Sequence, residues 1–390
     1  MWEGWNEVGD RIHVGSGPSS RRSHLVVMVL ALVLAALMGT VVVGCSGGDL
    51  PSAGGSQGDS GSDGTSEDGS LTGTLNGAGA TFPKPLYIEW IGEFQASNPG
   101  VKVNYQGIGS GGGIEQFTKL TVDFGASDAP MTDEEIAAAE EAGGAAILHI
   151  PTVFGSVVLA YNLSDVSDLK LDADTLSGIY LGEITSWSDE RIAALNPELD
   201  LPDQAIQAVH RSDSSGTTNI FTSYLSEVSP AFDQAVGPGK DVGWPGGVGG
   251  QGNDGVAAVV QQQAGSIGYV ELSYALESEL PMVSLENQAG NFVVPSLEST
   301  SAAADGMEFP EDLRFSASNS SNPEAYPIVG ATWILAYEQM ADAGKAAILK
   351  AWLEYSLTEG GWLAEELGYA PLPDSLRELA LAKVESISGF

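Results

Sequence analysis

The chain has 390 residues but a single cysteine, Cys45, so no intrachain disulfide can form. Histidine is almost as scarce, because only four are present and two of these lie in the N-terminal leader. The remaining two, His149 and His210, both fall inside apolar strand patterns. Without a cluster of cysteine and histidine, a zinc or iron–sulfur site is not expected. We therefore expect no metal and no cofactor.

Basic residues are also few. The 15 lysines and arginines face 52 aspartates and glutamates, which gives a formal net charge of −37. Such a surface repels nucleic acid and anionic lipid. It also repels small anions at long range, so any anion site must work through short-range hydrogen bonds. Only four arginines follow residue 44, namely Arg191, Arg211, Arg314 and Arg377.

The N-terminus has the pattern of an export signal. Arg21 and Arg22 precede an apolar run from Leu25 to Val43, and Gly44 and Cys45 follow it. We predict that residues 1–45 are a signal peptide with a lipobox and that Cys45 is lipidated. An uncleaved membrane anchor is the alternative, because the apolar run is nearly long enough to span a bilayer. Residues 46–70 are mostly Gly, Ser and Asp, so we predict a disordered tether there.

The stretch Arg211-Ser212-Asp213-Ser214-Ser215-Gly216-Thr217-Thr218 has the features of an anion site. It follows a predicted strand, 205–210, and precedes a helical pattern that begins with Ile220 and Phe221. The first N–H groups of a helix lack internal partners, and the helix dipole favours negative charge there. Arg211 adds a planar set of donors, which Asp213 could hold in place.

Two further turns share this strand–turn–helix pattern, Gly77–Phe82 and Gly107–Gly113. Each turn alone is weak evidence, since glycine turns are ordinary features of loops. Ligands of open α/β sheets bind where such turns cluster, at the carboxyl ends of the strands. Strands alternating with helices predict an α/β fold with largely parallel sheets. Within it, a long buried strand is expected over 147–161, and one helix is expected to carry Ile114, Phe117 and Leu120.

Two enzymatic or cofactor-binding interpretations compete with an anion site. Gly107-x-Gly109-x-x-Gly112 fits the dinucleotide motif, but a lone match is weak and gives the Arg211 turn no role. Ser110 could be a nucleophile, but Ile108 stands where the nucleophile-elbow motif requires glycine. No nucleophile–base pair is evident, because both remaining histidines are better explained as core residues.

Asp128 stands at the end of a short predicted strand, 122–127. It is either a turn former or a ligand contact. If it faces an anion, it must accept a proton from that anion, because two bare anions in contact repel strongly. Phosphate keeps a proton near neutral pH and sulfate does not. A carboxylate in the pocket would therefore select phosphate over sulfate by repulsion.

At these residues the chain resembles the phosphate-binding protein of the high-affinity bacterial phosphate ABC transporter. The resemblance runs from about Leu71 to beyond Thr332. It rests on the following segments: GAGATFPKPLY (77–87), VNYQGIGSGGG (103–113), VDFGASDAP (122–130), IYLGEITSW (179–187), RSDSSGTT (211–218), GNDGVAA (252–258) and IGYVE (267–271).

The resemblance implies a two-lobed, Venus-flytrap binding protein with a parallel-rich sheet in each lobe and a hinge. Lobe 1 would be discontinuous, 71–157 plus 264–390, and lobe 2 would be 158–263. By matching motif positions, the resemblance implies these phosphate contacts: Thr81, Phe82 (through its N–H), Ser110, Asp128, Arg211, Ser215, Gly216 and Thr217. Asp213 would pair with Arg211 and hold it.

The predicted function is reversible capture of inorganic phosphate without chemistry, so we do not expect an enzyme. The protein would act as a monomer on the outer face of the bacterial cytoplasmic membrane, tethered by its lipid anchor. It would deliver phosphate to the permease and ATPase complex of an ABC transporter. The alternatives are a binder of another tetrahedral oxyanion, such as arsenate, and a secreted phosphatase that uses Ser110.

Overall fold

The computed structural model describes residues 64–65 and 70–390. The predicted signal peptide, Cys45 and most of the predicted tether lie outside these residues. Within the described part, the strands are β1 Gly64–Thr65, β2 Leu71–Gly79, β3 Val101–Gly107, β4 Phe124–Ser127, β5 Ile147–Tyr161, β6 Lys170–Leu171, β7 Gln207–Arg211, β8 Val248–Gly250, β9 Ser266–Glu271, β10 Ser284–Glu286, β11 Phe292–Val293, β12 Val329–Tyr337, β13 Gln339–Met340, β14 Ala370–Pro371 and β15 Ser388–Gly389.

The helices alternate with these strands, as the sequence pattern predicted. They are α1 Lys84–Ser97, α2 Ser110–Thr118, α3 Asp133–Gly143, α4 Ala173–Tyr180, α5 Glu190–Leu195, α6 Gly216–Val228, α7 Pro230–Ala235, α8 Gly252–Gln262, α9 Leu272–Glu277, α10 Leu297–Ala304, α11 Ala343–Leu357, α12 Gly361–Glu366 and α13 Asp374–Ser386. No helix in the described ranges is both long and apolar enough to cross a bilayer.

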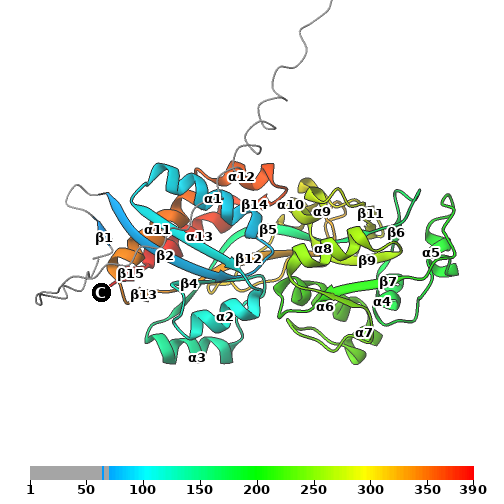
Figure 1. The fold of residues 1–390 in the computed structure, drawn as a ribbon, viewed down its shortest axis with the longest axis horizontal. Coiled ribbons are helices and arrows are strands. Elements are labelled where there is room, and N and C mark those ends of the chain that lie inside the picture. Colours follow the sequence, from blue (N-terminus) through cyan, green and yellow to red (C-terminus); the bar gives the residue numbers. More distant parts are fainter. Residues whose placement is uncertain (1–63, 66–69) are drawn as a thin grey trace, which may run out of the picture. The chain divides into compact units, whose positions relative to one another are not determined.

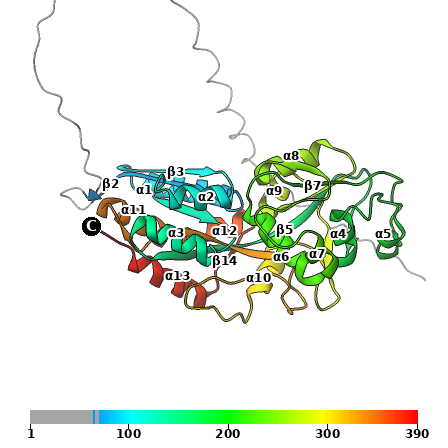
Figure 2. The ribbon, with the colours of Figure 1, turned by 90° about the horizontal axis from the view of Figure 1, so that it is seen from below.

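Two sets of parallel strands are joined by antiparallel ones. β2 pairs in parallel with β3 and β4, and β7 pairs in parallel with β8 and β9. β5 and β12 pair antiparallel with each other, because the chain leaves along one and returns along the other. Figure 1 shows β5 and β12 running between two groups of elements, and Figure 2 shows the same groups from below. The predicted parallel pairing is therefore confirmed within both sets of strands, whereas β12 and β5, which connect the sets, pair antiparallel with their neighbours.

β5 changes partners along its length. Residues 147–156 pair with β12, whereas residues 157–161 pair with β9. Pro151 lies within β5, where the register with β12 shifts between Thr332 and Trp333. Proline has no N–H for the sheet, so an irregularity at this point is the arrangement that a long strand can tolerate. β5 is nearly all buried, as its continuous apolar pattern predicted.

Most of the hydrophobic residues that the structure describes pack in one large buried core, which includes the wholly buried Trp90, Trp187, Trp333 and Trp352. Leu120 is an exception. We expected it on a buried helix face, but α2 ends at Thr118 and Leu120 is half-exposed with a φ of 57°. Thr132 and Glu135 form a capping box at the start of α3.

Candidate functional site

The parallel strands bring the predicted turns together. β2, β3 and β4 run in the same direction, so the residues that follow them lie at one edge of the sheet. Thr81 and Phe82 follow β2, Ser110 follows β3, and Asp128 follows β4. The Arg211–Thr218 turn follows β7, and α8 begins immediately after β8, the parallel neighbour of β7.

Arg211 is held by Asp213. Its Nε donates to Asp213 Oδ1 at 2.8 Å and its Nη2 donates to Oδ2 at 2.5 Å. The Arg211 side chain is only 1% exposed, so this two-point pairing fixes a desolvated guanidinium. Burial works against ionisation of Asp213, but the guanidinium holds the pKa of this carboxyl below its usual value. Nη1 points elsewhere and donates to Thr217 Oγ1 at 3.2 Å.

The N-terminus of α6 approaches Ser110 and Asp128 closely. Ser215 is its N-cap, and the Ser215 hydroxyl accepts a hydrogen bond from the Thr218 N–H. Gly216 N donates to Ser110 Oγ at 3.1 Å. A Cβ at position 216 would lie 2.5 Å from Ser110 Oγ and 2.6 Å from Asp128 Cβ. Only glycine permits this approach.

Asp128 is a buried carboxyl with hydroxyl partners. Its Oδ1 accepts from Thr332 Oγ1 at 2.9 Å, and its Oδ2 lies 3.4 Å from Ser110 Oγ. Its side chain is almost wholly shielded from solvent. Burial raises the pKa of Asp128 to about 7, although Thr332, Arg211 and Ser110 favour the charged form.

Thr81 meets the second set of strands through Asn253, the second residue of α8. Both the backbone N and the Nδ2 of Asn253 donate to Thr81 Oγ1, at 3.2 and 3.0 Å. Among the described residues, the N–H groups of Phe82 and Thr217 have no hydrogen-bond partner, although both residues are fully buried. Buried N–H groups without a partner are rare in proteins and mark positions where a ligand acceptor fits.

The predicted contacts therefore form one connected cluster. One chain of hydrogen bonds links Thr81, Asn253, Thr217, Arg211 and Asp213, and another links Gly216, Ser110 and Asp128. The two chains meet at the start of α6. N–H and O–H donors with one carboxyl acceptor suit a tetrahedral oxyanion that still carries a proton.

Several residues of this cluster were missed from the sequence. Asn253 and Thr332 contact the predicted residues directly, the Tyr269 hydroxyl accepts from Arg211 N, and the Tyr274 hydroxyl donates to Thr81 O. A signal existed for Asn253, because Gly250 to Gly255 is a fourth glycine turn between a strand and a helix. Nothing local marks Thr332, which lies inside the apolar strand β12.

The competing interpretations find little support in the geometry. Ser110 Oγ is hydrogen-bonded to Asp128 and Gly216, and neither histidine contacts it. His149 is a core residue that accepts from Met131 N, with its pKa lowered to about 4 by burial, and His210 stacks on Trp244. The dinucleotide-like turn is covered, since a Cβ at Gly109 would lie 2.4 Å from Asp213 Oδ2. The part of the chain that the structure describes holds no group of three metal-ligating side chains.

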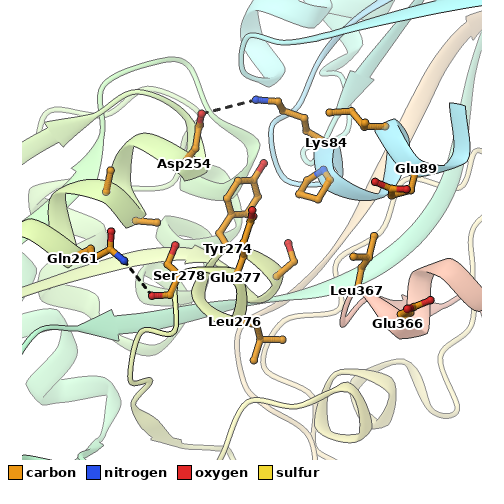
Figure 3. A pocket seen from close by; sticks show the side chains of 15 residues that line it. Lys84, Glu89, Asp254, Gln261, Tyr274, Leu276, Glu277, Ser278, Glu366 and Leu367 are labelled. Carbon is orange, nitrogen blue, oxygen red and sulfur yellow. Dashed lines mark hydrogen bonds and ion pairs between the residues drawn. The ribbon is translucent and has the colours of Figure 1, made fainter. Parts of the chain in front are cut away.

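A groove of about 880 Å³ lies beside the cluster but contains none of the predicted contacts. Figure 3 shows Lys84, Asp254 and Tyr274 on its walls, with Lys84 and Asp254 paired at 3.8 Å. A smaller cavity of about 170 Å³ is lined by Thr81, Asp213 and Gly252 among others. The partnerless donors lie at the cluster, so we place the candidate site there and not in the larger groove.

Residues 64–359 match the family model described as a PBP superfamily domain. The phosphate-binding protein PstS of Xylella fastidiosa (strain 9a5c) is 44% identical over 306 residues, covering 77% of this chain and 82% of the relative. PstS of Pasteurella multocida (strain Pm70) is 43% identical over 310 residues, covering 78% and 87%. The solved structure of PfluDING, a high-affinity periplasmic phosphate-binding protein bound with phosphate, superposes with a TM-score of 0.67 at 22% identity, covering 80% of this chain and 93% of that one.

Proposed function

The chain belongs to the PBP superfamily and, within it, to the PstS family of phosphate-binding proteins, and from this premise we propose that it captures inorganic phosphate for import. The relatives carry phosphate binding in their names, and the fold matches that of a phosphate-bound protein. The protein is a binding protein that delivers phosphate to the permease of an ABC transporter and carries out no chemistry itself.

One observation carries the proposal: buried donors from both sets of strands converge around a single buried carboxyl. The Phe82 N–H, the Thr217 N–H and the Arg211 guanidinium can each donate to a phosphate oxygen. Asp128 can accept the proton that phosphate retains. We propose that the contacts are Thr81, Phe82, Ser110, Asp128, Arg211, Ser215, Gly216 and Thr217, with Asp213 holding Arg211.

Capture by closure is supported by the strand pairing. Donors come from two groups of elements joined by β5 and β12, so only the closed arrangement makes both sets of bonds. The lobes implied by the resemblance are 71–157 plus 264–390 and 158–263, and we propose to move one of these boundaries. Because β9 pairs with β7 and β10 pairs with β6, the return to the first lobe is better placed at β12 than near residue 264.

The proposed location of the protein outside the cytoplasm depends on its N-terminal leader, residues 1–45. We propose that residues 1–45 direct export and that a lipid on Cys45 holds the protein, as a monomer, at the outer face of the membrane. Mass spectrometry of the mature N-terminus tests this part alone. A lipid-modified Cys45 is expected, whereas an intact leader would favour the uncleaved anchor.

Calorimetry with purified protein tests the central part. We expect phosphate to bind at one site and arsenate to compete for it, because both are tetrahedral and keep a proton. A chromogenic phosphate ester should not be turned over, and the same assay with Ser110→Ala serves as its control. Turnover that is lost in Ser110→Ala would instead support a phosphatase.

A further inference from the structure

Asn253 is a fully buried side chain between the two halves of the candidate site. Its Nδ2 donates to Thr81 Oγ1 at 3.0 Å and to Thr217 Oγ1 at 3.2 Å. Its Oδ1 accepts from the Glu271 N–H at 3.0 Å. Both hydrogens of the Nδ2 group are therefore donated to residues of the site, Thr81 and Thr217.

The orientation of this amide is fixed. Turning it over would set Nδ2 against the Glu271 N–H, so that two donors faced each other. Oδ1 would then face the hydroxyl oxygens of Thr81 and Thr217, which in the structure accept hydrogen bonds from Nδ2. The backbone N–H of Glu271 thus determines that Asn253 presents donors, and not an acceptor, to Thr81 and Thr217.

The hydroxyls of Thr81 and Thr217 can each still donate a hydrogen bond but can accept no more. Thr81 Oγ1 accepts from Asn253 N and Nδ2, and Thr217 Oγ1 accepts from Asn253 Nδ2 and Arg211 Nη1. A hydroxyl has two lone pairs and one hydrogen, so each can now act only as a donor. Within the described ranges, neither hydroxyl hydrogen has an acceptor.

We propose that Asn253 is a positioning residue for oxyanion capture, which saturates the acceptor sites of Thr81 and Thr217 and so commits both hydroxyls to donate to the bound anion. Asn253 also connects the turn after β2 to the start of α6, and these two segments belong to the two lobes that closure brings together. The proposal rests on the proposed function, because it assigns a role to a residue of that same site. Asn253 itself need not touch the anion.

Asn253→Asp and Asn253→Ala separate this role from simple packing. Aspartate has the same shape, but its carboxylate takes the two hydroxyl hydrogens for itself. We expect phosphate affinity to fall more than about 100-fold in Asn253→Asp at pH 8, since two donors are lost and a charge is added. Lowering the pH should restore part of this affinity, because a protonated carboxyl donates again. Asn253→Ala should lose roughly tenfold, because the hydroxyls become free to rotate.

A triple variant tests whether Asn253 acts through the threonines. If it does, adding Asn253→Ala to a Thr81→Val, Thr217→Val background should weaken phosphate binding by less than about twofold. The matched control is Asn196→Ala. Asn196 is also buried, but its side chain bonds to Lys170 and Ile192 and to no residue of the site. It should lower the melting temperature and leave phosphate affinity unchanged.

Outcomes against the inference can be told apart from failure of the proposed function. If the parent binds phosphate and folded Asn253→Ala binds within twofold of it, Asn253 has no positioning role. Full additivity with the threonine changes, or an Asn253→Asp defect that does not ease at lower pH, likewise overturns the inference. A parent that does not bind phosphate overturns both. Should Asn253→Ala fail to fold, the pH response of Asn253→Asp decides.

Discussion

The Asp128 carboxylate accepts a hydrogen bond from the Thr332 hydroxyl at 2.9 Å, in a site where burial raises its pKa to about 7. Thr332 thus supports the charged form of a group that burial pushes toward neutrality. This balance sets the carboxyl to change its charge near neutral pH. The selection of phosphate over sulfate should change with it.

Selectivity against sulfate should increase with pH. Below about pH 7 the Asp128 carboxyl is protonated and can donate to sulfate; above it the carboxylate repels sulfate but still accepts the proton of phosphate. We expect the ratio of sulfate to phosphate dissociation constants to be at least tenfold greater at pH 8.5 than at pH 5.5. This factor corresponds to a shift of roughly one unit in the pKa of Asp128 when sulfate binds. Competition calorimetry at both pH values measures it. A ratio that stays constant across this range would refute the role of Asp128.

Removing the charge of Glu271 should stabilise the protein at high pH only. The Glu271 side chain is fully buried, its Oε2 accepts from Ser273 N, and among the described residues its Oε1 has no partner. Burial raises the pKa of Glu271 from its usual value of 4.5 to about 8. Between these two pH values, the carboxyl keeps its proton in the folded protein and loses it in the unfolded chain. The stability that this group contributes is present below about pH 4.5 and is lost as pH rises through 8.

Glu271→Gln should therefore raise the melting temperature at pH 8.5 by a few degrees, for about 1–2 kcal/mol, and change it little at pH 4.5. Thermal unfolding followed by circular dichroism measures both. Exposed Glu141 on α3 provides the control, since Glu141→Gln removes a carboxylate that is not buried. Equal effects of Glu271→Gln at both pH values would contradict this account.

The planar guanidinium of Arg211 should contribute more to phosphate affinity than its charge alone. Arg211→Lys keeps the charge but cannot bond Asp213 at two points and reach Thr217 as well. We expect phosphate affinity to fall about 10- to 100-fold, the cost of one to two charge-assisted hydrogen bonds. Arg377→Lys, at a surface pair with Asp374, is the control and should bind like the parent. Calorimetry that found equal affinity for Arg211→Lys would show that charge alone suffices.

An ion pair outside the cluster should slow phosphate release. Lys240 Nζ lies 2.6 Å from Glu135 Oε1, and Lys240 O accepts from Ser215 N, the N-cap of α6. Glu135 is in α3, in the other group of elements, so opening must break this pair. We expect Lys240→Met to release phosphate roughly fivefold faster, for about 1 kcal/mol.

Stopped-flow displacement measures this rate. Added salt should speed release from the parent more than from Lys240→Met, because the variant has lost the screened pair. Lys119→Met removes the exposed pair with Glu115 at the C-terminal end of α2 and should leave the rate unchanged. If Lys119→Met has the same effect, the cause is net charge and not this contact.

Much of the site could be predicted because its residues stand in turns between strands and helices. The Arg211–Thr218 turn, the partner role of Asp213 and the end-of-strand position of Asp128 all follow from local pattern. The Arg211–Asp213 pair is confirmed at two points. The roles of the predicted residues as phosphate contacts remain predictions.

What could not be predicted depends on contacts between distant segments. Asn253 meets Thr81 across 172 positions, and Thr332 meets Asp128 across 204. The antiparallel pairing of β5 with β12 and the change of partner within β5 are likewise invisible in an evenly apolar strand. Leu120 was misplaced because hydrophobic spacing continued past the point where α2 ends.

The site has two halves with different tasks. Arg211 and the start of α6 supply attraction, while Asp128 determines which anion is accepted. The most direct test is the phosphate and sulfate affinity of the parent protein and of Asp128→Asn, measured by calorimetry at pH 8. The account predicts that the parent binds phosphate and shows no comparable sulfate binding, and that Asp128→Asn narrows the difference. Comparable binding of both anions by the parent would contradict it.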